Sequence, residues 1–505
     1  MLTRRTLLKG LAAAPLGMTV ACSSEPPAAS PRVTRSRPLP IPPLAASTVG
    51  SDGVRRFTLR ARVGTTEMLA GKHASTWGFN GAILGPTLRA RRGERVAVSL
   101  TNDLPEATSV HWHGMSIPAR FDGGPHQMIA PGASTEPQWT VEQQAATLWY
   151  HPHPHGSTQR HVLRGLAGLF ILDDADSAAL DLPNSYGVDD IPLIIQDRRF
   201  TPTGAVDETD NSDVGCLGDT IITNGITGAR LMVTTSAVRL RLLNGSSGRI
   251  FNLGFSDNRP FDVIASDGGL LPVPVRMRRI QLSPGERAEI VVRNVAGETV
   301  TLTSYPIAEN GGVKVSDAAR FGLTDRFDVL TLEAQHALTH HAGTPASLVG
   351  ADQLATAGAV ERSFDLQWFM INHRRMDMSR IDFEARVGAT EVWTVTNKDN
   401  WPHNFHVHDA QFHIIEIDGR RPPAHLAGRK DTVYVPPGTR VRLVLRWSGH
   451  ADPTFPYMFH CHMLMHEDRG MMGQFLVLAP RQRAKPMPSM PSMPSMPPRP
   501  GAHAQ

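Results

Sequence analysis

The chain has 505 residues, including 44 glycines, 40 prolines and 19% charged residues. Its length suits about three domains, and many turn-forming residues with few charges favour strands over helical bundles. The formal charge is +4, but basic residues do not form a run interleaved with aromatic residues, so we expect no nucleic-acid partner. Twenty-two histidines and nineteen methionines against three cysteines indicate metal chemistry rather than a disulfide framework.

The first residues resemble an export signal. Arg4 and Arg5 form a twin-arginine pair, and an apolar run extends from Leu11 to Ala21. We therefore expect export by the twin-arginine route to the periplasm, the cell envelope or the outside of the cell.

Two processing outcomes stay open for this signal. Cys22 follows Val20-Ala21 as in a bacterial lipoprotein signal and would then carry a lipid anchor, although Thr19 stands where a larger aliphatic residue is usual. Alternatively, cleavage near Ala12-Ala13-Ala14 leaves a soluble protein. Signal and tether together make up residues 1–46, and the part rich in Pro, Ser and Ala is expected to be flexible.

An internal repeat organises the rest of the chain. Three segments alternate apolar and polar residues with period two, as half-buried strands do: Arg95–Asn102, Val238–Asn244 and Glu391–Asn397. Each follows one landmark and precedes another: Asn80-Gly81, Asn224-Gly225 or Asn372-His373 before it, and Pro131-Gly132, Pro284-Gly285 or Pro437-Gly438 after it. Landmarks repeated in this order predict an all-β fold of three Greek-key β-sandwiches.

The domain boundaries follow from these repeats. We place the three sandwiches at residues 47–180, 185–335 and 360–480, with a connector from Ala337 to Arg362. Residues 481–505 form a Met- and Pro-rich tail, predicted to be disordered. Its methionines either collect cuprous ion or have no metal role: Met487, Met490, Met493 and Met496.

One short segment joins two kinds of predicted metal site. If His460, Cys461 and His462 lie on an extended strand, the thiolate points to one face and both imidazoles to the other. His466 and Met471 return to the side of the thiolate after a turn at Gly470. Thiolate, imidazole and a weak thioether are the ligands of a blue electron-transfer copper.

Three further His-x-His pairs accompany His460 and His462. They are His111 with His113, His151 with His153, and His406 with His408, the last preceded by His403. Eight imidazoles with few thiolates favour copper over a four-ligand structural zinc. The middle repeat contributes none, so we expect the cluster between the first and third sandwiches, with the second as a spacer.

These four motifs, in this order, resemble those of the multicopper oxidases, and the resemblance covers about residues 50–480. It implies three cupredoxin-like domains and four copper ions, one of type 1, one of type 2 and two of type 3. The implied type 1 ligands are His403, Cys461, His466 and axial Met471, and the type 2 ligands are His111 and His406. The implied type 3 ligands are His113, His151, His153, His408, His460 and His462. His155 falls outside the pattern and is expected to be structural or to lie outside the ligand shell.

The resemblance also implies a reaction. Substrate gives up one electron at a time at the type 1 copper, and the other three coppers reduce dioxygen to water. Asp122 and Glu467 fit proton relays, and Asp399 fits a partner for the free ring nitrogen of His403. The alternative is that all three acids are turn or surface residues.

The substrate stays open between cuprous ion and phenols. Cuprous oxidases of enteric type carry a Met-rich insertion that this connector lacks, but Met376, Met378 and the tail supply thioethers, and Trp401 stands near His403. Our hypothesis is Cu(I) oxidation in copper tolerance, with phenol oxidation as a side activity, by a monomer. The alternative is a general laccase. Two rival classes are a relative without copper that serves a structural or division role, and a copper-storage protein.

Overall fold

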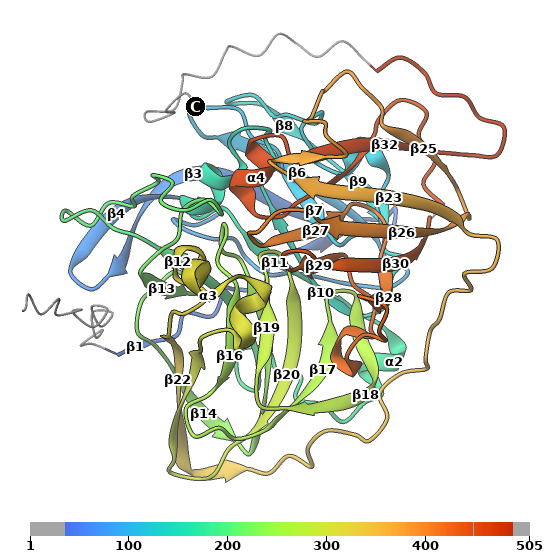
Figure 1. Cartoon of the computed structure of the whole chain (residues 1–505). Coiled ribbons are helices and arrows are strands. Elements are labelled where there is room, and N and C mark those ends of the chain that lie inside the picture. The colour runs from blue at the N-terminus through green and yellow to red at the C-terminus, as the bar shows by residue number, and fades with distance from the viewer. Residues whose placement is uncertain (1–35, 448, 488–505) are drawn as a thin grey trace, which may run out of the picture. The chain divides into compact units, whose positions relative to one another are not determined.

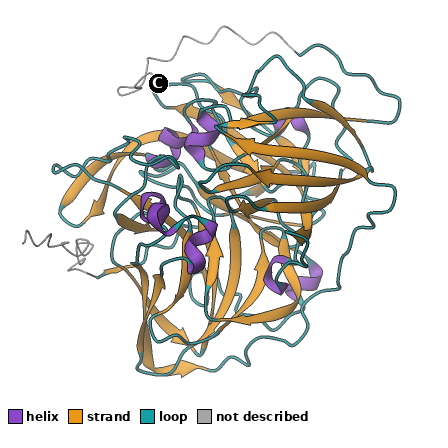
Figure 2. Ribbon diagram, viewed as in Figure 1, coloured by secondary structure: helices purple, strands orange, loops and turns teal. Residues whose placement is uncertain are grey.

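The structure, a computed structural model, describes residues 36–447 and 449–487. The predicted export signal, Cys22 and tail residues 488–505 lie outside the described residues. Strands dominate (Figure 2), and the helices of the described part are short. They are α1 (Thr158–Leu163), α2 (Ala175–Ala178), α3 (Val315–Ala318), α4 (Leu464–Asp468), η1 (Ala119–Phe121), η2 (Ala308–Gly312), η3 (Ala319–Phe321) and η4 (Ala424–Leu426). Within the described residues, no helix has both the length and the apolar character needed to span a membrane.

The first repeat folds into two sheets with a shared apolar core (Figure 1). One sheet has the order β2-β3-β6-β8, with β4 beside β3 and β9 beside β6, and the other has the order β5-β11-β10-β7. The strands are β2 (Thr48–Val49), β3 (Val54–Leu69), β4 (Lys72–Phe79), β5 (Leu88–Arg91), β6 (Arg95–Asp103), β7 (His111–His113), β8 (Ser134–Thr135), β9 (Gln138–Thr140), β10 (Ala146–His151) and β11 (Gly168–Asp173).

The middle repeat also forms two sheets, with the orders β13-β12-β15-β20-β17-β18 and β1-β14-β22-β21-β16-β19. The strands are β1 (Arg37–Pro38), β12 (Asp190–Arg198), β13 (Thr220–Thr223), β14 (Ala229–Thr235), β15 (Ala237–Asn244), β16 (Phe251–Phe255), β17 (Phe261–Ser266), β18 (Gly269–Met277), β19 (Ile280–Leu282), β20 (Arg287–Arg293), β21 (Thr299–Ser304) and β22 (Phe327–Thr339). A second apolar core lies between these sheets.

The third repeat has the sheet orders β24-β23-β26-β30-β28 and β25-β32-β31-β27-β29. The strands are β23 (Val360–Gln367), β24 (Met370–Ile371), β25 (Phe383–Arg386), β26 (Thr390–Asn397), β27 (His403–Val407), β28 (Phe412–Ile417), β29 (Thr432–Val435), β30 (Arg440–Arg446), β31 (Tyr457–His460) and β32 (Met472–Leu478). Its core continues onto residues of the middle repeat, including Val214 and Phe321.

The repeat landmarks occupy equivalent places in all three sandwiches. Each alternating strand pairs antiparallel with the strands after its Pro-Gly turn: β6 with β8 and β9, β15 with β20, and β26 with β30. The glycine N–H of each turn donates to the carbonyl of an asparagine: Gly132 to Asn102, Gly285 to Asn244 and Gly438 to Asn397. The predicted fold class, all-β with three β-sandwiches, is therefore confirmed.

Two local predictions were wrong. Residues 36–46 are not free tether, because β1 pairs with β14 and the Ala45 N–H donates to the carbonyl of Thr87. Strand β15 is buried on both faces rather than one. Its arginines, which the alternating pattern would put in solvent, form buried ion pairs; Arg241, for example, binds Asp190 (2.6 Å).

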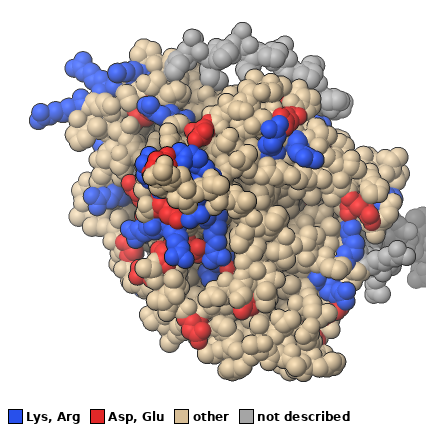
Figure 3. Space-filling model, turned by 180° about the vertical axis from the view of Figure 1, so that it is seen from behind, with Lys and Arg blue, Asp and Glu red and all other residues tan. Residues whose placement is uncertain are grey.

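Charges on the face shown in Figure 3 are mixed. Lys and Arg side chains gather on one side of this face with Asp and Glu among them, and much of the rest is uncharged. Exposed arginines are ion-paired in several places, such as Arg56 with Asp52 (2.6 Å) and Arg440 with Glu416 (2.7 Å). Part of the positive charge is thus neutralised locally.

Candidate metal centres

The predicted cysteine site forms within the third repeat. The Cys461 Sγ lies 3.6 Å from His403 Nδ1 and 3.4 Å from His466 Nδ1, and these two nitrogens are 3.1 Å apart. His403 begins β27, while Cys461 directly follows β31. A one-turn helix, α4, which sequence reasoning missed, brings His466 back. The carbonyl of Met471 accepts from the Cys461 N–H (3.1 Å), so this residue lies beside the site.

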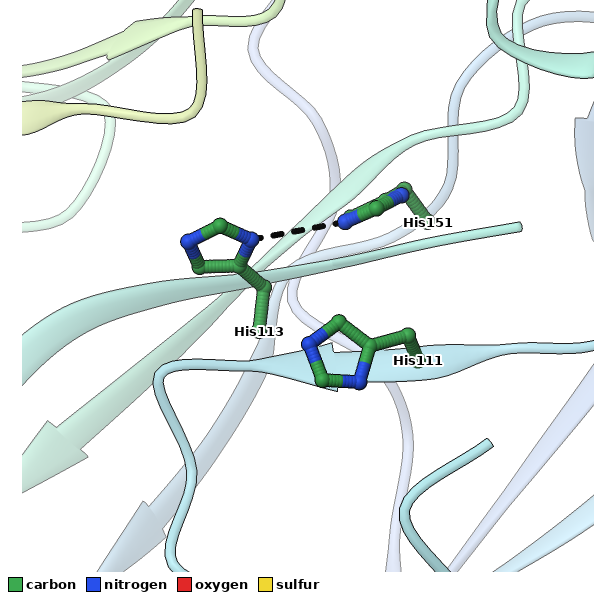
Figure 4. A group of neighbouring side chains, drawn as sticks. All are labelled: His111, His113 and His151. Atoms are coloured by element: carbon green, nitrogen blue, oxygen red, sulfur yellow. Dashed lines mark hydrogen bonds between the residues drawn. The ribbon is translucent and has the colours of Figure 1, made fainter. Parts of the chain in front are cut away.

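Strand pairing places five of the eight other histidines, and His153, His408 and His462 lie just past strand ends. Strand β7 carries His111 and His113, and the register places His151 of β10 opposite His111. Figure 4 shows the ring of His151 facing that of His113, with 3.4 Å between His151 Nε2 and His113 Nδ1. In the third repeat, the register places His406 of β27 opposite His460 of β31.

Ring nitrogens from the first and third repeats converge in three groups. His460 Nε2 lies 3.1 Å from His153 Nε2 and 3.2 Å from His408 Nε2. His151 Nε2 lies 3.4 Å from both His113 Nδ1 and His462 Nε2. His111 Nε2 and His406 Nε2 are 3.5 Å apart. All eight rings are buried.

Several of these rings point their second nitrogen at a protein acceptor. The contacts are His111 Nδ1 to the Asp122 carbonyl (2.9 Å), His151 Nδ1 to the Pro152 carbonyl (2.9 Å), His406 Nδ1 to the Asp431 carbonyl (2.8 Å), His408 Nδ1 to Asp122 Oδ2 (2.6 Å) and His113 Nε2 to Asp431 Oδ1 (2.9 Å). Donation there leaves the converging nitrogens with lone pairs and no proton to share. Lone pairs that converge in this way are stable around a cation, so these nitrogens fit the ligands of a bound metal ion.

Burial favours the neutral, metal-binding form of several of these imidazoles. Burial, together with neighbouring imidazoles, lowers the pKa of His151, His406 and His408 well below 6.5, and burial lowers that of His462 to about 3. Burial also raises the pKa of the Cys461 thiol to about 12. A coordinated thiol is deprotonated outright, so a metal ion is what would hold Cys461 as thiolate.

The three predicted acids all contact a histidine of these groups. Asp399 Oδ2 lies 2.9 Å from His403 Nε2, and Asp122 contacts His408 as described above. Glu467 lies with Oε1 3.4 Å from His153 Nδ1 and Oε2 3.3 Å from His460 Nδ1. Burial raises its pKa well above 4.5, which favours a carboxyl group that holds a proton.

Sequence reasoning missed several partners of the histidines. Asp431 contacts His113 and His406 from a position just before β29, where Lys430-Asp431 looks like an ordinary polar turn. The Asp213 carbonyl, from the middle repeat, accepts from His466 Nε2 (2.7 Å). No local signal marks either residue. His155, partly buried, belongs to none of the ligand-like groups found among the described residues.

Aromatic rings cover the outer edge of the cysteine site. Trp401 lies 5.2 Å from Trp368 and 6.0 Å from Phe369 between ring centroids, and Trp368 is 56% exposed. Trp368 and Phe369 have φ angles of 52° and 58°, in the left-handed region that non-glycine residues rarely adopt. The backbone N–H of Trp368 donates to Asp399 Oδ2 (2.9 Å), the same oxygen that contacts His403.

Known proteins resemble the chain over most of its length. Models described as multicopper oxidase match residues 60–177 and 350–481. A relative named multicopper oxidase mco, from Staphylococcus haemolyticus, is 36% identical over 446 residues, covering 86% of this chain and 91% of the relative. The cell division protein FtsP of Sodalis glossinidius is 37% identical over 467 residues, covering 91% and 96%.

Solved structures show the same architecture. A laccase-like multicopper oxidase, CueO, from Ochrobactrum sp. is 38% identical with a TM-score of 0.79, covering 87% of this chain and all of that one. A laccase from Pediococcus acidilactici is 33% identical with a TM-score of 0.79, covering 88% and 94%. The three sandwiches are thus cupredoxin-like, as predicted, and the chain belongs to the multicopper oxidase family.

Proposed function

We propose that the chain is a four-copper oxidase that couples one-electron oxidation of a substrate to reduction of dioxygen to water. The observation that carries this proposal is the tripeptide His460-Cys461-His462. Its thiolate lies with His403 and His466, while its imidazoles join two histidine groups with the first repeat. Three consecutive residues thus link two metal sites covalently.

The assignment of ligands follows the groups of nitrogens. In this proposal His403, Cys461, His466 and Met471 hold the type 1 copper, and His111 and His406 hold the type 2 copper. The two type 3 coppers are held by His153, His408 and His460, and by His113, His151 and His462. When bound, copper supplies one-electron transfer at the first site and multi-electron reduction of dioxygen at the other three.

In this proposal the acidic side chains around the histidine groups form the route for protons. Burial raises the pKa of Glu467 well above 4.5, which favours its protonated form, and the Thr158 hydroxyl lies 2.7 Å from its Oε1. Asp122 lies on another side, where its carbonyl contacts His111 and its Oδ2 contacts His408, while Oδ1 lies 3.3 Å from His111 Nδ1 and makes no hydrogen bond among the described residues. Carboxyl groups at both places can supply protons to an enclosed oxygen site.

The outer edge of the cysteine site favours aromatic donors such as phenols. An exposed Trp368, set edge-to-face against Trp401, offers an apolar aromatic surface near His403. The left-handed backbone angles of Trp368 and Phe369 each raise the free energy of the folded chain by about 1–3 kcal/mol, and such strain concentrates at functional sites. These features support the laccase alternative.

Cuprous ion is the second candidate substrate, and one contact favours it. The Met376 N–H donates to the Gly470 carbonyl (2.9 Å), directly before Met471, and the side chains of Met376 and Met378 are partly buried. Thioether prefers Cu(I) to harder ions. Oxidising Cu(I) outside the cytoplasm would protect against copper, and export through the Arg4-Arg5 signal would bring the enzyme there.

Dioxygen uptake by the copper-loaded protein tests the proposed function. We expect four coppers per chain, a blue colour from Cys461 thiolate bound to copper, and uptake of one dioxygen for every four electrons supplied by a phenol. A colourless protein with four coppers contradicts the proposal. A blue protein without oxygen uptake favours copper storage, and a protein that binds no copper favours a structural role like that suggested by the name of FtsP.

Two variants separate the substrates. Trp368→Ala is expected to raise KM for phenols without changing that for Cu(I), whereas Met376→Leu with Met378→Leu raises KM for Cu(I) alone. Equal loss of both activities in either variant indicates damage to the site rather than altered substrate choice. Truncation after Lys485 tests the tail in the same way, because under the cuprous hypothesis it raises KM only for Cu(I).

A further inference from the structure

A turn of the middle repeat lies directly against the histidine groups, although this repeat supplies none of the proposed ligands. The turn contains Pro284 and Gly285 and runs from residue 283 to 287. Gly285 has φ +84°, and a Cβ there would lie 3.0 Å from His462 Nδ1 and 3.2 Å from His113 Cε1. Only a residue without a side chain leaves these two rings where they are.

Arg287, at the end of this turn, is fully buried and rigidly held. Its Nη1 donates to Asp431 Oδ1 (2.7 Å) and its Nη2 to Asp431 Oδ2 (2.6 Å). The same guanidinium group donates to the carbonyls of Thr147 (3.0 Å), Gly285 (3.0 Å) and Asp267 (2.9 Å). A bidentate pair with this many fixed donors sets the plane of the Asp431 carboxylate.

Asp431 passes this orientation to two rings from different repeats. Its Oδ1 accepts from His113 Nε2 (2.9 Å) and its carbonyl accepts from His406 Nδ1 (2.8 Å). The two rings stack with centroids 3.8 Å apart. Because Nε2 of His113 donates its proton to Asp431, the lone pair lies on Nδ1, the nitrogen that faces His151.

A second set of contacts from the turn reaches the third repeat through Asn404. The Asn404 Nδ2 donates to the Pro284 carbonyl (2.8 Å) and lies 3.2 Å from Ser283 Oγ. Its Oδ1 accepts from the backbone N–H of His462 (2.6 Å). The turn therefore holds the backbone of His462 through Asn404 and closely faces its ring at Gly285.

We propose that the turn 283–287 of the middle repeat is a positioning element of the histidine cluster, in which Arg287 and Gly285 set the orientation of His113, His406 and His462. This inference rests on the proposed function, in which these rings hold copper. It gives the middle sandwich a role in the metal site in place of the predicted role of spacer.

The equivalent turns of the other repeats provide matched controls. Gly132 and Gly438 follow proline, have φ +75° and +69°, and make the same backbone hydrogen bond as Gly285. Apart from the adjoining residues, no heavy atom of the described part of the chain lies within 4 Å of the Cβ position at either glycine. An alanine therefore has similar backbone strain at all three positions. Only at Gly285 would its Cβ also press against histidine rings.

The first test compares Gly285→Ala with Gly132→Ala and Gly438→Ala in the full-length protein. We expect all three to lower the Tm of the copper-free protein, and Gly285→Ala alone to lower copper bound by the histidine cluster. Cluster copper is measured as total copper per folded chain and as the electron paramagnetic resonance signal of the cluster. The blue absorption of copper bound to Cys461 is the internal control. Equal cluster copper in all three variants overturns the proposal.

The second test compares Arg287→Lys with Arg241→Lys. Arg241 is also buried and binds two carboxylates, Asp190 and Glu289, but within the described residues neither of these acids, unlike Asp431, hydrogen-bonds a histidine of the cluster. Loss of a residue that orients a ligand is expected to weaken cluster copper binding roughly 10–100-fold in Arg287→Lys, with unchanged copper in Arg241→Lys. Equal copper affinity in Arg287→Lys and wild type, or equal loss in both variants, overturns the proposal. Failure of the proposed function is seen in the wild type instead, as absence of the copper, the blue colour or the oxygen uptake expected above.

Discussion

The cysteine site and the histidine cluster are built in different ways. The cysteine site draws its four proposed ligands from one repeat, within residues 403–471. The cluster draws four histidines from each of two repeats, and acceptors and a supporting turn come from residues far away in the chain. The proposed mononuclear site therefore takes its ligands from one sandwich, with one acceptor, the Asp213 carbonyl, from the middle repeat, whereas the cluster forms only where the first and third repeats meet.

The largest expected effect separates the two sites completely. Cys461→Ser removes the thiolate, so the blue colour and substrate oxidation are expected to disappear while copper in the histidine cluster stays bound. Optical absorption, copper analysis and oxygen uptake measure these quantities. Loss of cluster copper as well would show that the two sites do not form independently.

The next effect concerns the cluster alone. Glu467→Gln keeps the shape of the side chain but removes a proton donor, so turnover with dioxygen is expected to fall roughly 10²–10⁴-fold, while the blue colour remains. Single-turnover reduction of the Cys461 site by substrate serves as the control and should stay at the wild-type rate. Normal turnover in Glu467→Gln would remove this carboxyl group from the proton supply.

A smaller effect is expected at the cysteine site. Asp399→Ala removes the acceptor for His403 Nε2 and for the Trp368 N–H, so copper affinity at this site is expected to fall roughly 10–100-fold. The cluster should keep its copper and its resonance signal. Loss of cluster copper in this variant would contradict the independence of the two sites.

A separate effect, on folding stability rather than on copper, is the pH dependence of the copper-free protein. Burial lowers the pKa of His462 from 6.5 to about 3, so the unfolded chain binds a proton there that the folded chain does not. The contribution of His462 to the free energy of unfolding is fully present above pH 6.5. It falls by about 1.4 kcal/mol for each pH unit toward pH 3, which is a tenfold change in the folding equilibrium constant per unit. Denaturation of wild type and His462→Gln between pH 7 and 4 measures the difference, and identical slopes would contradict it.

Much of the fold and site can be predicted because the patterns are local. The period-two strands, the paired landmarks and the His-x-His spacing each depend on a few neighbouring residues. The predicted strands therefore appear as β6, β15 and β26, and every predicted ligand lies in or beside one of the two sites. The exceptions are also local: α4 is only five residues long, too short for a periodic signal to announce it.

The sequence by itself determined the three repeats, the cysteine with its flanking histidines, and the family that these motifs resemble. Only the tertiary structure decided which residues surround those ligands. His113 and Asp431 are 318 residues apart, Arg287 belongs to a repeat without proposed ligands, and Gly285 differs from Gly132 and Gly438 only in what faces it. The physical reason is that alternation and turn chemistry are properties of short segments, whereas burial, ion pairing and close approach depend on which faces of distant strands meet.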